Sequence, residues 1–201
     1  VGFTVNTDNS DKIICDMMDK IRHRGPDAEG RYVDSDIALG HRRLSIIDVS
    51  TTGDQPIYNE DGSLVIVFNG EIYNYKSIRE ELISAGHIFK TNTDTEVLVH
   101  GYEEYGEKIL NKLRGMFSFV IWNKNTKELF GARDFFGIKP MYYAHMNNVF
   151  MFGSEIKSFL PHPDFQKELN TSALENYLTF QYSPANETFF KNVYKLPPAH
   201  F

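Results

Sequence analysis

The chain has 201 residues, of which 41% are hydrophobic and 14% aromatic, and its formal net charge is −6. This length suits one domain with a core of its own, and the apolar and aromatic content excludes a disordered chain and favours β structure. The negative charge excludes a strongly basic surface for nucleic acid or for an anionic membrane.

The cysteine content and the first residues of the chain indicate the redox compartment and whether residues precede Val1. The single cysteine, Cys15, excludes an intramolecular disulfide framework and suits the reducing cytoplasm. No apolar run approaches the roughly 18 residues of a membrane span, and no signal peptide opens the chain. The first residues, VGFTV, have the pattern of the middle of a strand, so we expect residues ahead of Val1 in the intact protein. No repeat or linker divides the chain, and we expect one domain over residues 1–201.

The first half of the chain combines a helix with short strands. A helix is expected over residues 11–21, capped by Ser10, because apolar residues recur there at helical spacing. Cys15 lies off this apolar stripe without a base beside it, which indicates a packing role. Strands are expected at 31–33, 37–41, 44–48 and 64–68.

Two further helices are expected next. The first begins with Asn74 as its N-cap and ends at Gly86. The second begins in the capping-box pattern formed by Thr93 and Glu96, and it ends at Gly106.

From residue 115 the pattern changes to short aromatic strands. They are expected at 115–123, 127–134, 141–145 and 149–154, and one more helix at 172–180. Because strands and helices cluster instead of alternating, we expect an α+β fold with antiparallel sheets in the core and helices packed outside.

Common metal and nucleotide motifs are absent from the sequence. The seven histidines are scattered, without HExxH spacing or cysteine partners, so we expect no metal site. Neither GxGxxG nor a P-loop occurs. The segment GARDFFGIKP at 131–140 fits a structural hairpin better than a phosphate cradle.

The stretch FNGEIYN at 68–74 leaves two interpretations open. Asn-Gly is a common hairpin turn, but the helical pattern after Asn74 argues against a second strand there. At a strand end, the side-chain amide of Asn69 and the backbone N–H of Gly70 together suit a developing oxyanion. A structural loop that uses Asn-Gly for its conformational tolerance is the simpler local interpretation.

Three charged residues suit an amino-acid ligand. Arg43 can fork onto a carboxylate, although a surface ion pair explains it more simply. Asp94 can accept an ammonium shared with Glu71, although an acid in the first turn of a helix is also favoured by the helix dipole. With Asn69 and Gly70, these residues describe a pocket for an α-amino acid whose side-chain carbonyl is attacked. The sequence offers no evident nucleophile for that attack.

Nine segments now form an ordered set that spans nearly the whole chain. They are RHRGPD (22–27), HRRLSIID (41–48), GDQP (53–56), FNGEIYN (68–74), TDTE (93–96), GMFSF (115–119), ARDFFGIKPMYY (132–143), GSEIK (153–157) and KLPPAH (195–200). Each is weak alone, but together they resemble the N-terminal glutaminase domain of the glutamine-hydrolysing asparagine synthetases. These enzymes are class II (Ntn-type) glutamine amidotransferases.

The resemblance implies a fold and a reaction. The fold would be a four-layer αββα sandwich of two antiparallel sheets, of the Ntn hydrolase type. The reaction would be hydrolysis of L-glutamine to glutamate and ammonia. The nucleophile in this family is an N-terminal cysteine whose α-amino group shuttles the proton. It would lie three residues before Val1, outside the given sequence.

The resemblance also assigns roles to the candidate residues. Asn69 and Gly70 would form the oxyanion hole, while Arg43 would bind the α-carboxylate of glutamine. Glu71 and Asp94 would bind its α-amino group. The pocket would further be lined by the backbone at Ile46 and Ile47.

The resemblance implies a partner domain as well. Ammonia would pass to a C-terminal synthetase domain of the same protein, which would use ATP and Mg to convert aspartate to asparagine. No cofactor is expected in the glutaminase domain itself. Two alternatives stay open: a non-catalytic scaffold of the same fold, and a glutaminase that serves a different amidation acceptor. The sequence leaves the oligomeric state open, a homodimer included.

Overall fold

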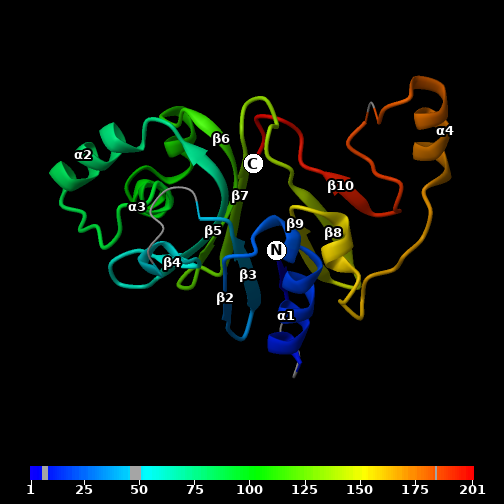
Figure 1. Cartoon of the computed structure of the whole chain (residues 1–201), viewed down its shortest axis with the longest axis horizontal. Coiled ribbons are helices and arrows are strands. Elements are labelled where there is room, and N and C mark those ends of the chain that lie inside the picture. Colours follow the sequence, from blue (N-terminus) through cyan, green and yellow to red (C-terminus); the bar gives the residue numbers. More distant parts are fainter. Residues whose placement is uncertain (6–8, 46–50, 184) are drawn as a thin grey trace.

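The computed structural model describes residues 1–5, 9–45, 51–183 and 185–201, and its described strands form two antiparallel sheets packed face to face (Figure 1). One apolar cluster lies between the sheets, and one lies beneath the helices on each outer face. The layers therefore run helix, sheet, sheet, helix, which confirms the expected αββα sandwich.

The first sheet contains the first strand of the chain near its middle. Its six strands follow the order β10-β8-β9-β1-β3-β2, and all neighbours are antiparallel. Helix α1 (Ser10–Lys20) packs on its outer face through Ile14, Met17 and Met18, which are fully or almost fully buried. The strands are β1 (Gly2–Thr4), β2 (Ala28–Val33), β3 (Ile37–Arg43), β8 (Tyr142–Met146), β9 (Val149–Gly153) and β10 (Val193–Lys195).

The second sheet has four strands in the order β4-β5-β6-β7. Helices α2 (Tyr75–Ala85) and α3 (Thr95–Tyr105) cover its outer face and bury Leu82 and Leu98 against it. The strands are β4 (Ile57–Tyr58), β5 (Leu64–Ile72), β6 (Gly115–Asn123) and β7 (Glu128–Arg133).

The last helix stands apart from the sandwich. Helix α4 (Thr171–Phe180) lies at the right edge of Figure 1, beyond β10, and among its residues only Ala173 is buried. Four short 3-10 turns complete the described elements: Arg22–Arg24, Thr51–Gly53, Gly106–Asn111 and Ile156–Phe159. No helix in the described part of the chain is long and apolar enough to cross a membrane.

Strand β5 shows how alternation builds the layers. Ile66 and Phe68 pack beneath α2 and α3, whereas Val65 and Val67 face the first sheet. Since side chains alternate along a strand, Asn69 continues the row of Val65 and Val67 and faces the space between the sheets.

Two strand predictions near the site are wrong in their bounds. The strand expected at 44–48 does not form at Leu44 and Ser45, because β3 ends at Arg43, opposite Ala28 where its partner β2 begins. Residues 46–48 lie outside the described residues. Strand β5 was expected to end at Asn69 and Gly70, but it continues to Ile72, because β6 supplies pairing partners as far as Gly115.

The helix starts also differ from the prediction. Ser10 is the first residue of α1, and Asn9 takes the N-cap position. Asp94 takes the N-cap position of α3 in place of Thr93. The glutamate of the expected capping box, Glu96, instead accepts hydrogen bonds from the backbone of Lys90 and Thr91. The predicted helix ends at Gly86 and Gly106 are confirmed, and both glycines have positive φ.

Candidate active site

Two adjoining cavities lie where β3, β5 and the start of α3 meet. The larger has a volume of about 240 Å³, and the smaller, about 80 Å³, is bordered by Val1, Gly40 and Ser118. His41 and Asn69 line both cavities. The larger cavity brings together every described residue of the predicted site: Arg43, Asn69, Gly70, Glu71 and Asp94. Ile46 and Ile47 lie outside the described residues.

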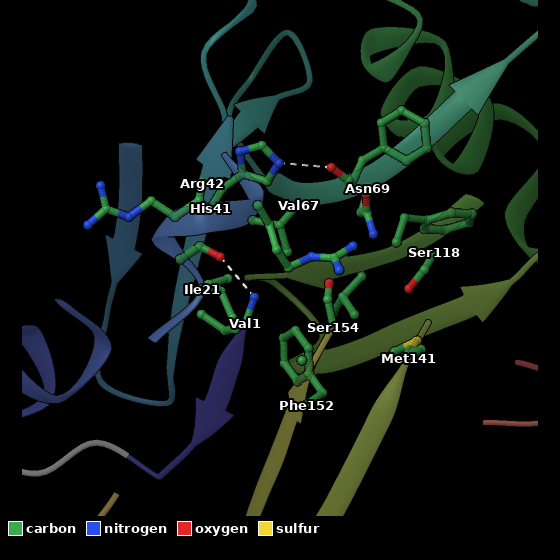
Figure 2. A pocket seen from close by; sticks show the side chains of 16 residues that line it. Val1, Ile21, His41, Arg42, Val67, Asn69, Ser118, Met141, Phe152 and Ser154 are labelled. Atoms are coloured by element: carbon green, nitrogen blue, oxygen red, sulfur yellow. Dashed lines mark hydrogen bonds between the residues drawn. The ribbon is translucent and has the colours of Figure 1, made fainter. Parts of the chain in front are cut away.

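The side-chain amide of Asn69 is a hydrogen-bond donor at the cavity wall. Its Nδ2 is buried and has no hydrogen-bond partner among the described residues. Figure 2 shows the side chain directed into the smaller cavity, on the side of Ser118. A buried polar group that lacks a partner costs about 1–3 kcal/mol, so this arrangement opposes stability. Chemically, the amide is placed to donate to an oxygen that enters the cavity.

The backbone of Gly70, the next residue on β5, supplies a second donor at the adjoining larger cavity. The N–H groups of Phe68 and Ile72 point away from β6, because they donate to Gln55 Oε1 at 2.6 Å and Asp94 Oδ2 at 2.8 Å. Along an antiparallel strand the direction of the N–H alternates, so the N–H of Gly70 points to the same side as theirs. It therefore faces the larger cavity, between the side chains of Gln55 and Asp94.

Arg43, the last residue of strand β3, is one of the cations that line the larger cavity. Its side chain is buried, and its Nη1 donates to Asp54 Oδ1 at 2.7 Å. The turn Thr51–Gly53 packs so closely that a Cβ at Gly53 would lie 2.5 Å from Arg43 Nη2. The guanidinium is thus a fixed, planar donor group at the cavity wall, and not the exposed ion pair considered as the simpler explanation.

Two carboxylates, those of Glu71 and Asp94, also line the larger cavity. Asp94 is buried at the N-cap of α3, and burial raises the pKa of its carboxyl, with the negative charge of Glu71 adding to the rise. The hydrogen bond from the N–H of Ile72 acts to lower this pKa, because it favours the ionised carboxylate. Two acids that repel each other in a cavity create a site where a cation is stabilising.

Two polar residues of the site, Gln55 and His41, were not predicted from the sequence. Gln55 is buried and joins both backbone groups of Phe68, with its Nε2 donating to the carbonyl at 3.1 Å and its Oε1 accepting from the N–H. His41 Nε2 donates to the same carbonyl at 2.9 Å (Figure 2). Burial lowers the pKa of His41 to about 4, so the imidazole is neutral, and its Nδ1 lacks a partner among the described residues.

Sequence patterns gave little warning of these two residues. Both lie inside segments quoted for the family resemblance, GDQP and HRRLSIID, but neither segment indicates a contact with Phe68. The contacts depend on the pairing of strands far apart in the chain. Their position within these two motifs could have marked both residues as candidates, but the sequence did not indicate that they contact Phe68.

Cys15 does not belong to the site. It lines neither cavity, packs half-buried against the cluster beneath α1, and burial raises the pKa of its thiol. A raised pKa keeps the thiol protonated and unreactive at neutral pH. The packing role predicted for Cys15 is confirmed.

Comparisons with known proteins agree with this geometry. The profile of a family described as the glutamine amidotransferase domain matches residues 1–201. Asparagine synthetase [glutamine-hydrolyzing] 1 of Bacillus subtilis is 47% identical over 192 residues, which cover 96% of this chain and 30% of that protein. The amidase chry2 of Gibberella zeae is 39% identical over 186 residues, covering 92% of this chain and 27% of that protein. This chain thus spans less than a third of the length of these relatives.

A solved structure shows the same fold at low sequence identity. The glutamine phosphoribosylpyrophosphate amidotransferase of B. subtilis, complexed with ADP and GMP, superposes with a TM-score of 0.69 at 20% identity. The match covers 84% of this chain and 44% of that one. At this identity the likeness concerns the fold alone.

Proposed function

Because the chain belongs to the glutamine amidotransferase domain family, we propose that its larger cavity binds L-glutamine and that the domain hydrolyses it to glutamate and ammonia. The observation that carries this proposal is a pair of neighbouring donors on β5: the buried amide of Asn69, at the smaller cavity, and the N–H of Gly70, at the adjoining larger cavity. Neutral donors fixed before the reaction stabilise an oxyanion without reorganisation.

The proposed nucleophile is a cysteine three residues before Val1. Three residues span at most about 11 Å, and Val1 borders the smaller cavity together with Asn69. The thiol would therefore reach the region of the oxyanion donors. It attacks the carboxamide carbon, the α-amino group of the same cysteine passes the proton to the leaving ammonia, and water hydrolyses the thioester.

The rest of the cavity suits the amino-acid end of glutamine. Arg43 would bind the α-carboxylate while it keeps its bond to Asp54. Glu71 and Asp94 would bind the α-ammonium, whose positive charge would offset the effects of burial and of the Glu71 charge that raise the pKa of Asp94. Backbone at Ile46 and Ile47 is proposed to complete the pocket, and no cofactor takes part in these steps.

The longer protein is proposed to be an asparagine synthetase of the cytoplasm. The high identity to asparagine synthetase 1 of B. subtilis over 96% of this chain supports this assignment. Ammonia would pass to a C-terminal domain that uses ATP and Mg to convert aspartate to asparagine. The similarity to the amidase chry2 keeps a different amidation acceptor as the second candidate, since the acceptor is chosen outside this domain.

The test is substitution of Asn69 in the intact enzyme. Asn69→Ala should lower the kcat of glutamine hydrolysis by roughly 10²–10³, as expected for loss of one oxyanion donor. Asn69→Asp, which keeps the size and removes the donor, should be at least as damaging. Asn125→Ala, at an exposed turn, is the control.

Two results would overturn the proposal. One is a loss of less than about threefold in Asn69→Ala, which would remove the oxyanion role. The other is any residue except cysteine at the third codon before Val1, which would favour a non-catalytic scaffold.

A further inference from the structure

Four side chains converge beside helix α3, outside the cavities of the candidate active site. Glu60 lies between β4 and β5, His87 follows α2, and His100 and Glu103 lie on α3. One ligand atom from each lies within 4.8 Å of all the others. None of the four lines the cavities proposed to bind glutamine. From this convergence we propose a divalent-cation site for Zn²⁺ or a similar transition metal, built from Glu60, His87, His100 and Glu103.

The geometry at His100 is that of a ligand and not of a hydrogen-bonded side chain. Its side chain is 1% exposed, and its Nδ1 lies 3.0 Å from Glu60 Oε2. That contact is not aligned as a hydrogen bond, so Nδ1 has no hydrogen-bond partner among the described residues. Ligand atoms around a tetrahedral zinc lie about 3.3 Å apart and point at the metal, not at one another. Nδ1 of His100 and Oε2 of Glu60 match this relation.

Both imidazoles have a carboxylate at their second nitrogen. His100 Nε2 lies 3.4 Å from Glu96 Oε1, and His87 Nε2 lies 3.5 Å from Glu104 Oε2. The Nδ1 atoms of both rings are turned toward Glu60, at 2.9 Å for His87. A metal-bound histidine commonly donates its other N–H to a carboxylate, which fixes the ring and its tautomer.

The outer carboxylate at His100 is itself held in place. Glu96 is almost fully buried, and it accepts hydrogen bonds from the backbone N–H groups of Lys90 and Thr91, both at 2.7 Å. Glu60 is similarly oriented by the N–H of Ile88 at 3.0 Å. The metal-ligand atoms of His100 and Glu60 are therefore held in position before any ion binds.

Charge and donor type indicate the class of ion. Two carboxylates, Glu60 and Glu103, balance a divalent cation, while the two imidazoles bind as neutral ligands. Imidazole nitrogen with carboxylate oxygen suits Zn²⁺, whereas Mg²⁺ and Ca²⁺ select oxygen donors. Glu103 is exposed, so an ion can enter the site from solvent.

An ion-pair network of protonated histidines is the competing explanation. The pKa of Glu60 is lowered to about 2, since hydrogen bonds from Ile88 and His87 and the charge of His100 outweigh burial, which would raise it. Such a network accounts for the contacts of His87. It pairs His100 Nδ1 with Glu60 Oε2 at 3.0 Å but without the alignment of a hydrogen bond among the described residues, whereas a metal ion between the two atoms would use both.

The site has a structural role in this proposal. Its ligands join the β4–β5 turn, the segment after α2 and the middle of α3, which share the outer side of the second sheet. Asp94, which is proposed to bind the α-ammonium of glutamine, lies at the start of α3. A bound ion would therefore hold in place the helix that positions Asp94.

The test is zinc binding by the purified, chelator-treated protein. With ZnCl₂ alone as the probe, we expect one ion per chain by elemental analysis and calorimetry. At a hundredfold excess over Kd the melting temperature should rise by about 5–10 °C, whereas MgCl₂ at the same concentration should not change it.

Variants separate the site from adventitious binding. His87→Gln and Glu103→Gln, which spare the buried His100, should each remove the bound ion and the thermal shift. His145→Gln and Glu80→Gln, exposed and outside the cluster, should keep both. Absence of zinc binding, or binding that survives both cluster variants, would refute the site. Glutaminase activity of the intact enzyme, measured in parallel, reports separately on the proposed function.

Discussion

The side chains at the cavity occupy positions where burial would normally select apolar residues. Asn69 follows Val65 and Val67 on the face of β5 that meets the first sheet, and its amide nitrogen is left without a partner among the described residues. On β3, the Nδ1 of His41 likewise has no hydrogen-bond partner in the part of the chain that the structure describes. Retaining polar atoms that oppose stability is common where a ligand supplies the missing bonds.

The buried imidazole of His41 predicts a pH dependence of stability. Burial lowers the pKa of His41 to about 4 in the folded protein, whereas an unperturbed histidine has a pKa of about 6.5. Between these values the unfolded chain binds the proton more readily than the folded protein does. The free energy of unfolding should therefore fall as the pH falls from about 6.5 to about 4.

The variant His41→Gln isolates this contribution. Glutamine can still donate to the carbonyl of Phe68 but does not titrate, so the variant should lose less stability than the parent between pH 7 and pH 5 in urea unfolding. His145→Gln, at an exposed position, should behave like the parent. Equal pH dependence in all three proteins would contradict the role given to His41.

In the described part of the chain, strand β5 is held on its cavity side by side chains beyond Ile66, and not by another strand. Strand β4 pairs only with Val65 and Ile66, and the side chains of Gln55 and Asp94 then bond the N–H groups of Phe68 and Ile72. Because side chains take the place of a pairing strand here, the N–H of Gly70 faces the cavity. An edge continued by a full strand would have used that N–H for pairing.

Gln55 is therefore predicted to position the oxyanion donors. Gln55→Ala leaves the N–H of Phe68 unbonded, and we expect a loss of about 1–3 kcal/mol in the free energy of unfolding. We also expect kcat for glutamine hydrolysis to fall about tenfold or more with a smaller change in KM, because the donors act on the transition state.

Asn74→Ala is the matched control for Gln55→Ala. Asn74 also bonds one backbone carbonyl and one N–H, those of Lys112 and Arg114, but it lines neither cavity. It should lose comparable stability and keep kcat at temperatures where it is folded. If the two variants lost kcat equally, Gln55 would have only a structural role.

The whole sandwich brings the site together from both sheets. The first sheet supplies His41 and Arg43 at the end of β3, and the second supplies Asn69 and Glu71 on β5. The α3 helix adds Asp94 from the outer layer. In the longer enzyme that we propose, this domain supplies ammonia to a second one, so substrate binding here and amidation there are separable.

Arg43→Ala is predicted to impair the use of glutamine while leaving ammonia-dependent amidation nearly unchanged. Loss of a charge-assisted bond to the α-carboxylate should raise KM for glutamine by about 10–100-fold. Amidation in the intact enzyme supplied with ammonium salt should change little, since it bypasses the glutamine site. Steady-state kinetics with each nitrogen source measures this, and equal losses with both would refute the assigned role.

Prediction from sequence was reliable where local physics decides. Gly86 and Gly106 end helices because their positive φ suits glycine, and the aromatic strand at 115–123 was predicted with its observed bounds. It failed where a partner decides: β5 continues past Gly70 because β6 is beside it, and the two-residue strand β4 was not predicted.

The sequence by itself determined the fold class and the residues of the candidate glutamine site, through periodicity and an ordered set of motifs. Tertiary structure alone decided which donors are unpaired, that Gln55 and His41 hold Phe68, and that Glu60 meets His87 and His100. The reason is physical: helical and strand periods are local properties of the chain. A polar group's partner depends on which distant segments the packing of two sheets places beside it.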